Sequence, residues 1–150
     1  MQPLATAGAG FLLAVLWFDL MFDVQVARYL HAEPPEPVLG SIAGYYRRVT
    51  TEARPMNRLV ALAMLVTVVA VAVEVVRGDG PTAARWMSLV LVLVPVGVAG
   101  RRTVPSAKRL GFRRDPAHTQ AALARAIYRQ HMLCAVFISA LLVVQLVWMR

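Results

Sequence analysis

Length, composition and charge already exclude most classes of protein. The chain has 150 residues, of which 59% are hydrophobic, and a formal net charge of +8; its mean hydropathy is +0.60. A soluble domain breaks its apolar residues with periodic polar ones, whereas here they form long blocks. The length allows one domain and no separate catalytic module. Because the basic residues cluster between apolar blocks, their charge indicates membrane orientation, and we expect no nucleic-acid partner.

Four apolar blocks are long enough to span a bilayer. A hydrocarbon core about 30 Å thick needs about 20 helical residues, and suitable segments cover residues 4–30, 57–76, 83–99 and 116–149. Pro95 predicts a kink near the end of the third segment, and Asp115 followed by Pro116 predicts the start of the fourth. The sequence therefore predicts an all-α integral membrane protein, a four-helix transmembrane bundle that forms a single domain over residues 1–150.

The connections between these helices differ in length and charge. The second is a short turn with Gly and Pro at residues 77–81, whereas the first and third, at residues 30–56 and 100–125, are long and basic. Of the 16 Lys and Arg residues, 13 lie in or beside the two long connections, and three lie on the other side: Arg77, Arg85 and Arg150. By the positive-inside rule, the long connections are cytoplasmic and both termini are extracytoplasmic.

Composition also suggests where the protein is found and what it contacts. All but one of the basic residues are Arg, and Ala and Val are abundant, which is typical of a GC-rich bacterial genome. We therefore expect a multi-pass protein of the bacterial inner membrane. Its expected partners are the lipid bilayer, anionic lipid head groups at the cytoplasmic loops, and either further copies of itself or a partner membrane subunit.

Two acids interrupt the first apolar block past its midpoint, toward the cytoplasmic side. Asp19 and Asp23 are four residues apart, so they share one helix face. A carboxylate at membrane depth costs on the order of 2.5–3.5 kcal/mol on insertion scales, and ionisable residues there are candidates for function by default. The alternative is that the two acids pair with Arg for purely structural reasons.

Other polar residues lie at a similar depth on other helices. The second helix opens with an Asn-Arg pair, and the fourth carries an Arg and, two residues later, a His near its start. We predict that these side chains converge with the two acids in the cytoplasmic half of the bundle, where they provide acid–base chemistry and hold a polar group of a substrate. The predicted catalytic residues are Asp19, Asp23 and His131, and the predicted substrate-binding residues are Asn57, Arg58 and Arg129.

The residue types leave the cofactor open. Asp19, Asp23 and His131 are suitable ligands for iron, manganese or zinc, although no pair has the spacing of a metal motif such as His-Glu-x-x-His. A divalent metal held by these three residues is therefore one alternative. A haem between two facing histidines is not expected, because no second His lies at the depth of His131.

The extracytoplasmic half of the bundle is expected to be apolar. Glu74 should lie close to the outer boundary of the membrane, where Arg77, one turn further on, can pair with it. Gln145 can form a hydrogen bond between helices.

Two stretches of the chain resemble a known family. Residues 102–110, with the Val104-Pro105 pair, are followed by Asp115-Pro116 and are similar to the valine–proline segment after the third helix in small four-helix bacterial membrane proteins of the anthrone-oxygenase-like family. Residues 125–131 are similar to that family's Arg- and His-bearing start of the last helix. The resemblance implies a membrane-embedded oxidoreductase or oxygenase-like activity. The positions that carry over are Arg129 and His131, and the chain departs from the family pattern at Ser106, Tyr128 and Gln130.

A second family of similar size also has four helices. Residues 54–57 resemble the start of the second helix in membrane-associated proteins of eicosanoid and glutathione metabolism. That family places an acid after the Asn, where this chain has Arg58.

Two classes of function fit these patterns. The first is an oxidoreductase that acts on a lipid-soluble small molecule such as a polyketide, a quinone or a sterol-like compound. The alternative is a non-enzymatic membrane component: a subunit, an assembly factor or a small proton-linked transporter whose acidic residues contact a partner helix or conduct protons.

Overall fold

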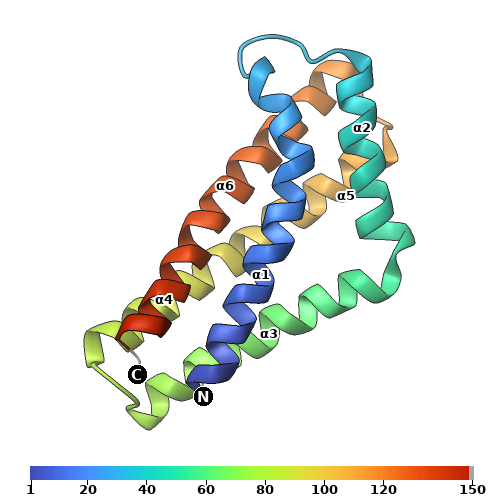
Figure 1. The fold of residues 1–150 in the computed structure, drawn as a ribbon. Coiled ribbons are helices and arrows are strands. Elements are labelled where there is room, and N and C mark those ends of the chain that lie inside the picture. Colours follow the sequence, from blue (N-terminus) through green and yellow to red (C-terminus); the bar gives the residue numbers. More distant parts are fainter. Residues whose placement is uncertain (149–150) are drawn as a thin grey trace.

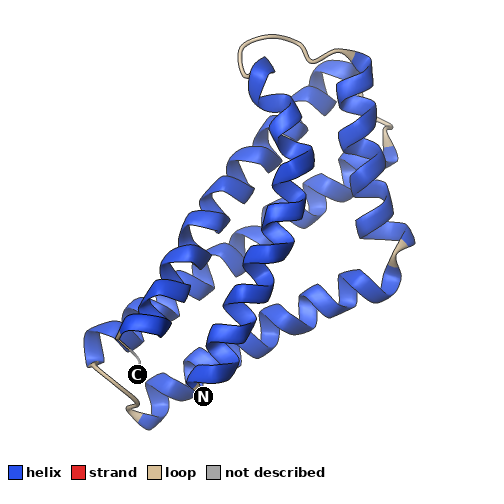
Figure 2. Cartoon of the chain, viewed as in Figure 1, coloured by secondary structure: helices blue, strands red, loops and turns tan. Residues whose placement is uncertain are grey.

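The computed structural model describes residues 1–148, which form six α-helices and three shorter helical segments, with no strand among them (Figures 1 and 2). Met149, the predicted last residue of the fourth helix, and Arg150, one of the basic residues on the terminal side, lie outside the described residues. The α-helices are α1 (Gln2–Asp23), α2 (Glu36–Arg47), α3 (Arg54–Arg77), α4 (Thr82–Val98), α5 (Val104–Phe112) and α6 (Ala117–Val147). The shorter segments are the 3₁₀-helix η1 (Val24–Tyr29) and the π-helices η2 (Arg48–Glu52) and η3 (Ala99–Thr103).

Four segments are long and apolar enough to cross a membrane: Gln2–Tyr29, Pro55–Arg77, Thr82–Phe112 and Ala117–Val147. The predicted all-α bundle with four spans is confirmed, and the chain is a multi-pass membrane protein. The third segment extends further than the predicted range of residues 83–99, because α4 continues through η3 into α5. Pro95 lies inside α4.

The first long connection is largely helical, which the sequence patterns did not indicate. In α2 the buried side chains are Leu39, Ile42, Ala43 and Tyr46, spaced as one face of an amphipathic helix. Pro37, early in α2, suits the first turn of a helix because its missing N–H would have no helical partner there. The buried face of α2 packs against α5 and α6 in one apolar core with Leu110 and Ile127.

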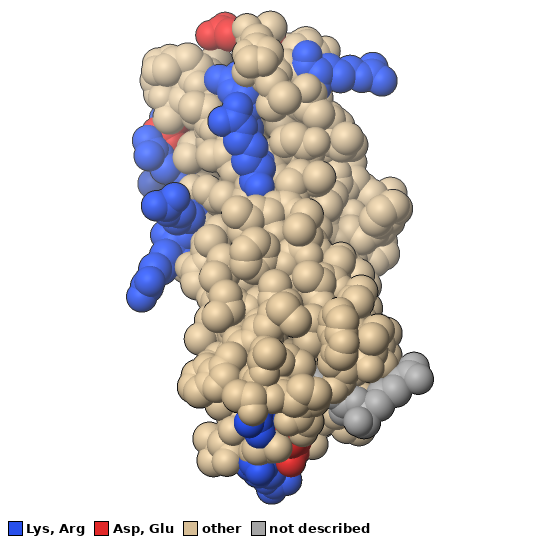
Figure 3. Space-filling view, turned by 90° about the vertical axis from the view of Figure 1, so that its left-hand side faces the viewer, with Lys and Arg blue, Asp and Glu red and all other residues tan. Residues whose placement is uncertain are grey.

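The bundle has two different ends. At one end, Gln2 donates a hydrogen bond from Nε2 to the backbone oxygen of Gln145 at 2.9 Å, so the start of α1 and the end of α6 lie together (Figure 1). We call this the terminal end. The other end is formed by α2, α5 and the start of α6, and we call it the Arg-rich end. On the face shown in Figure 3, a band without Lys, Arg, Asp or Glu separates the charged side chains near the two ends.

The helices α1 and α3 are in close contact at Gly8 and Thr67. A Cβ atom added at Gly8 on α1 would collide with the side chain of Thr67 on α3, so glycine is what permits this approach. Toward its Arg54 end, α3 leans away from α1 (Figure 1). The backbone of α3 packs on α1 and α4 but does not approach that of α6 within the described residues. This divergence leaves room for a cavity in the half of the bundle nearer the Arg-rich end.

Candidate functional site

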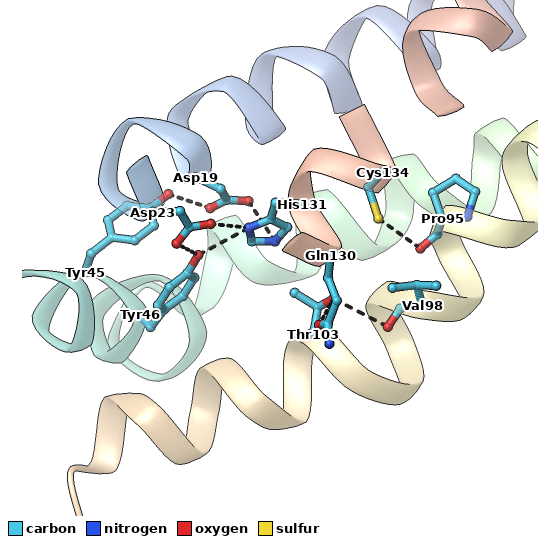
Figure 4. A network of polar contacts seen from close by, with 10 residues as sticks. All are labelled: Asp19, Asp23, Tyr45, Tyr46, Pro95, Val98, Thr103, Gln130, His131 and Cys134. Carbon is cyan, nitrogen blue, oxygen red and sulfur yellow. Dashed lines mark hydrogen bonds and ion pairs between the residues drawn. The ribbon is translucent and has the colours of Figure 1, made fainter. Parts of the chain in front are cut away.

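Asp23 is the last residue of α1, and its carboxylate is completely buried. The hydroxyl of Tyr46 on α2 donates a hydrogen bond to Oδ1 at 2.6 Å, and Nδ1 of His131 on α6 lies 2.6 Å from Oδ2 (Figure 4). Both oxygens therefore have a close partner from a different helix. A buried carboxylate with such partners can hold an imidazole in one orientation and one tautomer.

His131 is buried, with 6% of its surface exposed. An ionised Asp23 can only accept a hydrogen bond, so Nδ1 carries the hydrogen of this contact and, in the neutral ring, Nε2 has its lone pair available for a proton. The nearest acid to Nε2 is Asp19, whose Oδ2 is 3.8 Å away. That distance is too long for a hydrogen bond, so Nε2 is free to interact with a ligand.

Asp19 lies one turn before Asp23 on α1 and is held by a second tyrosine. The hydroxyl of Tyr45 donates a hydrogen bond to Asp19 Oδ1 at 2.7 Å. The Tyr45 ring stacks on Phe22 with a centroid distance of 4.0 Å and an interplanar angle of 8°. Burial, followed by the neighbouring carboxylates, raises the pKa of Tyr45 and Tyr46 above the ordinary value of about 10. Both tyrosines therefore remain protonated donors at neutral pH.

A cavity of about 540 Å³ extends from this cluster toward the middle of the bundle. This volume is within the usual range for small-molecule pockets, about 300–1,000 Å³. At one end Asp19, Tyr45, Tyr46 and His131 line it. Most of the remaining lining is apolar and comes from α1, α3, α4 and α6: Leu12, Leu16, Val60, Met64, Pro95, Val96 and Ile138.

The cavity is bordered by apolar side chains that face outward. Phe18 on α1 and Met56 on α3 both line the cavity, yet 61% and 51% of their surfaces are exposed. They mark an opening between the two helices at the level where α3 leans away from α1. The outer surface of these two apolar segments is of the kind that contacts lipid.

The structure brings together four of the six residues that the sequence predicted for the site. Asp19, Asp23 and His131 form the cluster, and Asn57 lines the cavity while its Nδ2 donates to the Thr50 backbone oxygen at 3.2 Å. The expected convergence of Arg58 and Arg129 on this site is wrong. Both are exposed, and neither lines the cavity.

Helix geometry explains why the two arginines lie elsewhere. Consecutive residues of an α-helix are turned by about 100°. Arg129 precedes His131 by two positions, so it faces nearly the opposite side of α6, and Arg58 is turned by one step from Asn57. An earlier arginine of α6 has a structural task instead: Arg125 donates from Nη1 to the backbone oxygens of Tyr29 and Ala32, at 3.3 and 3.1 Å.

A metal ion held jointly by Asp19, Asp23 and His131 does not fit this geometry. Asp23 contacts Nδ1 of the imidazole, and Asp19 lies on the side of Nε2. The two ring nitrogens point in different directions, so one ion cannot reach all three residues. Within residues 1–148, no group of three His, Cys, Asp or Glu side chains is placed to hold a metal ion.

The two tyrosines of the site were not among the residues predicted from the sequence. Tyr46 occupies the last of four buried positions on the amphipathic face of α2. A buried tyrosine normally has a hydrogen-bond partner for its hydroxyl, so this periodicity was the signal that could have found it. Tyr45, its partly buried neighbour, carried no comparable signal.

A second buried polar cluster lies near the terminal end. Nε2 of Gln145 donates to Glu74 Oε2 at 2.9 Å and to Ser88 Oγ at 3.3 Å, and all three side chains are fully buried. The predictions that Glu74 pairs with Arg77 and that this half of the bundle is apolar are therefore wrong. Glu74 continues the buried stripe of α3 that includes Thr67, Ala70 and Val71, so the helix period directs it inward.

Comparison with known proteins adds nothing to this description, since no family model, no curated protein and no solved structure matches the chain.

Proposed function

We propose that this membrane protein is an enzyme that binds a lipid-soluble small molecule in the cavity and transfers a proton to or from it through His131. One observation carries the proposal: the Asp23–His131 pair is buried, and the ring nitrogen that Asp23 does not engage lies at the polar end of an apolar cavity. A histidine held by a carboxylate is the usual arrangement of a general base.

Each residue of the cluster has a role in this proposal. His131 Nε2 accepts or returns the proton. Asp23 fixes the ring through Nδ1 and stabilises the imidazolium that forms, and Tyr46 holds Asp23 in place. Asp19, which has one oxygen without a close donor, contacts the polar group of the ligand.

The opening between α1 and α3 supports a ligand that arrives from the bilayer. Phe18 and Met56 at this opening offer only apolar contacts to a passing molecule. The apolar lining on four helices would then hold the body of the ligand, and the polar cluster would receive its reactive group. A water-soluble substrate would find few partners along this route.

We further propose that the reaction is an oxidation, as the resemblance to the anthrone-oxygenase-like family implies. Proton removal by His131 would be one half of such a reaction. The two electrons removed from the substrate would pass to molecular oxygen, the co-substrate that an oxygenase-like activity implies. Proton transfer is therefore the part of the chemistry that these residues support directly.

The orientation and location in the cell form a separate proposal. The excess of Arg around α2, α5 and the start of α6 supports a cytoplasmic Arg-rich end in a bacterial inner membrane, with anionic head groups as its neighbours. A cysteine placed at exposed Ala32 in a Cys134→Ser background should be labelled by a membrane-impermeant reagent only after the cells are opened. Labelling in intact cells contradicts the orientation.

The enzymatic proposal can be tested before the substrate is identified. Protein in lipid nanodiscs is incubated in deuterated water with a lipid extract of the membranes in which it is expressed, and the components are followed by mass spectrometry. We expect at least one lipid-soluble component to change in mass or to gain deuterium. His131→Asn should abolish this change, whereas the matched His118→Asn, at an exposed position of the same helix, should retain it.

The result also separates the enzyme from its alternative. If a component is retained by the protein but is chemically unchanged and gains no deuterium, the protein is a binding or transport component. A change that persists in His131→Asn contradicts the proposed role of His131.

A further inference from the structure

The carboxylate of Asp19 is only half satisfied by the protein. Its Oδ1 accepts the hydrogen bond from Tyr45 at 2.7 Å. Its Oδ2 lies 3.8 Å from Nε2 of His131, beyond hydrogen-bond distance. Asp19 also lines the cavity, so the oxygen that lacks a close donor belongs to the wall of the binding site. A ligand that donates a hydrogen bond to this oxygen would give it the partner that the protein does not supply.

The charges of the cluster are also unbalanced. Asp19 and Asp23 together carry two negative charges when ionised, whereas His131 supplies at most one positive charge. Within residues 1–148, the ion pairs of the two carboxylates involve His131 alone, with no Lys or Arg. Burial strengthens the effect of an uncompensated charge, so the polar end of the cavity favours a cation.

One basic residue, Lys108, also lines the cavity, but it forms no ion pair with Asp19 or Asp23. Lys108 on α5 is exposed, which places its side chain at the rim. An anionic ligand would use Lys108 and would meet the Asp19 carboxylate in the cavity wall. A cationic ligand would meet Asp19 and leave Lys108 in solvent. Asp23 is fully buried and only 16% of the Asp19 side chain is exposed, so both acids lie in a less polar surrounding than the exposed ammonium of Lys108, and the cation is favoured.

We propose that the ligand of this cavity is a lipophilic amine, bound as its ammonium ion with the N–H directed to Asp19 Oδ2. This inference rests on the proposed function, in which the cavity holds a lipid-soluble molecule. The apolar part of the amine lies along Leu12, Met64 and Ile138. His131 Nε2 is beside the same site, and it can take one proton: an N–H bond of the ammonium breaks, an Nε2–H bond forms, and the neutral amine and an imidazolium result.

Three probes with the same alkyl chain and different charge test this assignment. Decylamine, decanol and decanoate are equilibrated separately with protein in nanodiscs of neutral phosphatidylcholine, and binding is taken as the excess over empty nanodiscs. A net charge-assisted hydrogen bond corresponds to at least about tenfold in affinity. We therefore expect decylamine to bind at least about tenfold more tightly than decanol, and decanoate to bind most weakly.

Two Asp→Asn variants test whether the preference for the amine depends on Asp19. Asp19→Asn should bring decylamine to within about twofold of decanol, because the amide keeps the shape of the carboxylate and loses its charge. Asp79→Asn removes the same charge from an exposed turn near the terminal end and should leave the tenfold preference intact. The retained binding of decanol in Asp19→Asn shows that the variant is folded.

The outcomes separate this inference from the function on which it rests. If decanol or decanoate binds as well as decylamine, or if Asp19→Asn keeps the preference for the amine, the ligand class is wrong while the cavity remains a binding site. If no probe binds in excess over empty nanodiscs, the inference and the binding step of the proposed function both fail.

Discussion

Gly8 on α1 and Thr67 on α3 lie so close together that no side chain fits between them. The nearest atoms to a Cβ on Gly8 would be those of the Thr67 side chain, whose hydroxyl is already bonded to the Ala63 backbone oxygen at 2.7 Å. This contact joins the two helices in the half of the bundle nearer the terminal end. On its other side the helices separate and the cavity opens.

The first prediction concerns this contact. Gly8→Ala should lower the free energy of unfolding by about 1–3 kcal/mol, because the added methyl group must displace a β-branched side chain in a packed interface. Gly10→Ala is the matched control, since a Cβ there has no neighbour within 4 Å, and alanine should be neutral or slightly stabilising in the helix. Thermal unfolding in detergent measures both variants. Equal stability of the two would show that α1 and α3 do not meet at Gly8.

The second prediction concerns the tautomer of His131. The protein has three histidines, and the Asp23 contact requires a hydrogen on Nδ1 of this one. Nitrogen NMR of histidine-labelled protein should therefore show one ring with a protonated Nδ1, assigned by its absence in His131→Asn. Asp23→Asn should alter that signal and cost about 1–3 kcal/mol of stability, because the amide oxygen can accept from only one of the two buried donors.

An unchanged His131 signal in Asp23→Asn would contradict the geometry of the pair. Asp79→Asn, which changes the same residue type in an exposed turn, should leave both the signal and the stability as they are.

The third prediction follows from the raised pKa of Tyr45 and Tyr46. An unfolded tyrosine ionises near pH 10, whereas burial and the adjacent carboxylates keep these two protonated in the folded protein at that pH. Tyr46→Phe should therefore leave the tyrosinate absorbance of the folded protein at about pH 10 unchanged. In denaturant the same variant should lose the contribution of one of four tyrosines.

The same shift has a consequence for stability. A raised pKa in the folded state means that the unfolded chain releases its tyrosine protons first as the pH rises. The free energy of unfolding should therefore fall above about pH 10, and it should fall less steeply in Tyr46→Phe. A variant that shows the wild-type slope would contradict burial of this hydroxyl.

The fourth prediction concerns Glu74. Its Oε2 accepts the hydrogen bond from Gln145, whereas its Oε1 is buried without a hydrogen-bond partner. Glu74→Gln removes the charge and supplies an amide of the same shape, so it should stabilise the protein by about 1 kcal/mol or more. Glu33→Gln makes the same change at an exposed position and should have little effect. A clear loss of stability in Glu74→Gln would show that the carboxylate has a charged partner.

Local patterns in the sequence were enough to predict the four spans and the existence of a polar site. The length and hydropathy of each block determine whether it can cross a bilayer, and this property needs no partner. The spacing of Asp19 and Asp23 places both on one helix face whatever the packing. Of the two histidines in the last span, only His131 lies at a similar depth, which made it the expected partner for them.

Packing between helices decided which of these polar side chains meet in the site. Arg58 and Arg129 lie at the right depth for the site but on the wrong faces, and depth along a helix says nothing about which face meets a neighbour. Tyr45 and Tyr46 lie in α2, outside the four predicted spans. This helix folds back onto the bundle, so that the two hydroxyls donate hydrogen bonds to Asp19 and Asp23.

The sequence by itself determined that this chain crosses a membrane four times and carries acids at a depth where water is scarce, because both properties belong to single segments. Only the tertiary structure decided that Asp23 orients His131, that Asp19 keeps one oxygen toward an apolar cavity, and that Glu74 is buried against Gln145. Those relationships depend on the rotation and tilt of each helix against its neighbours. A small residue such as Gly8 sets that geometry through its contact with Thr67.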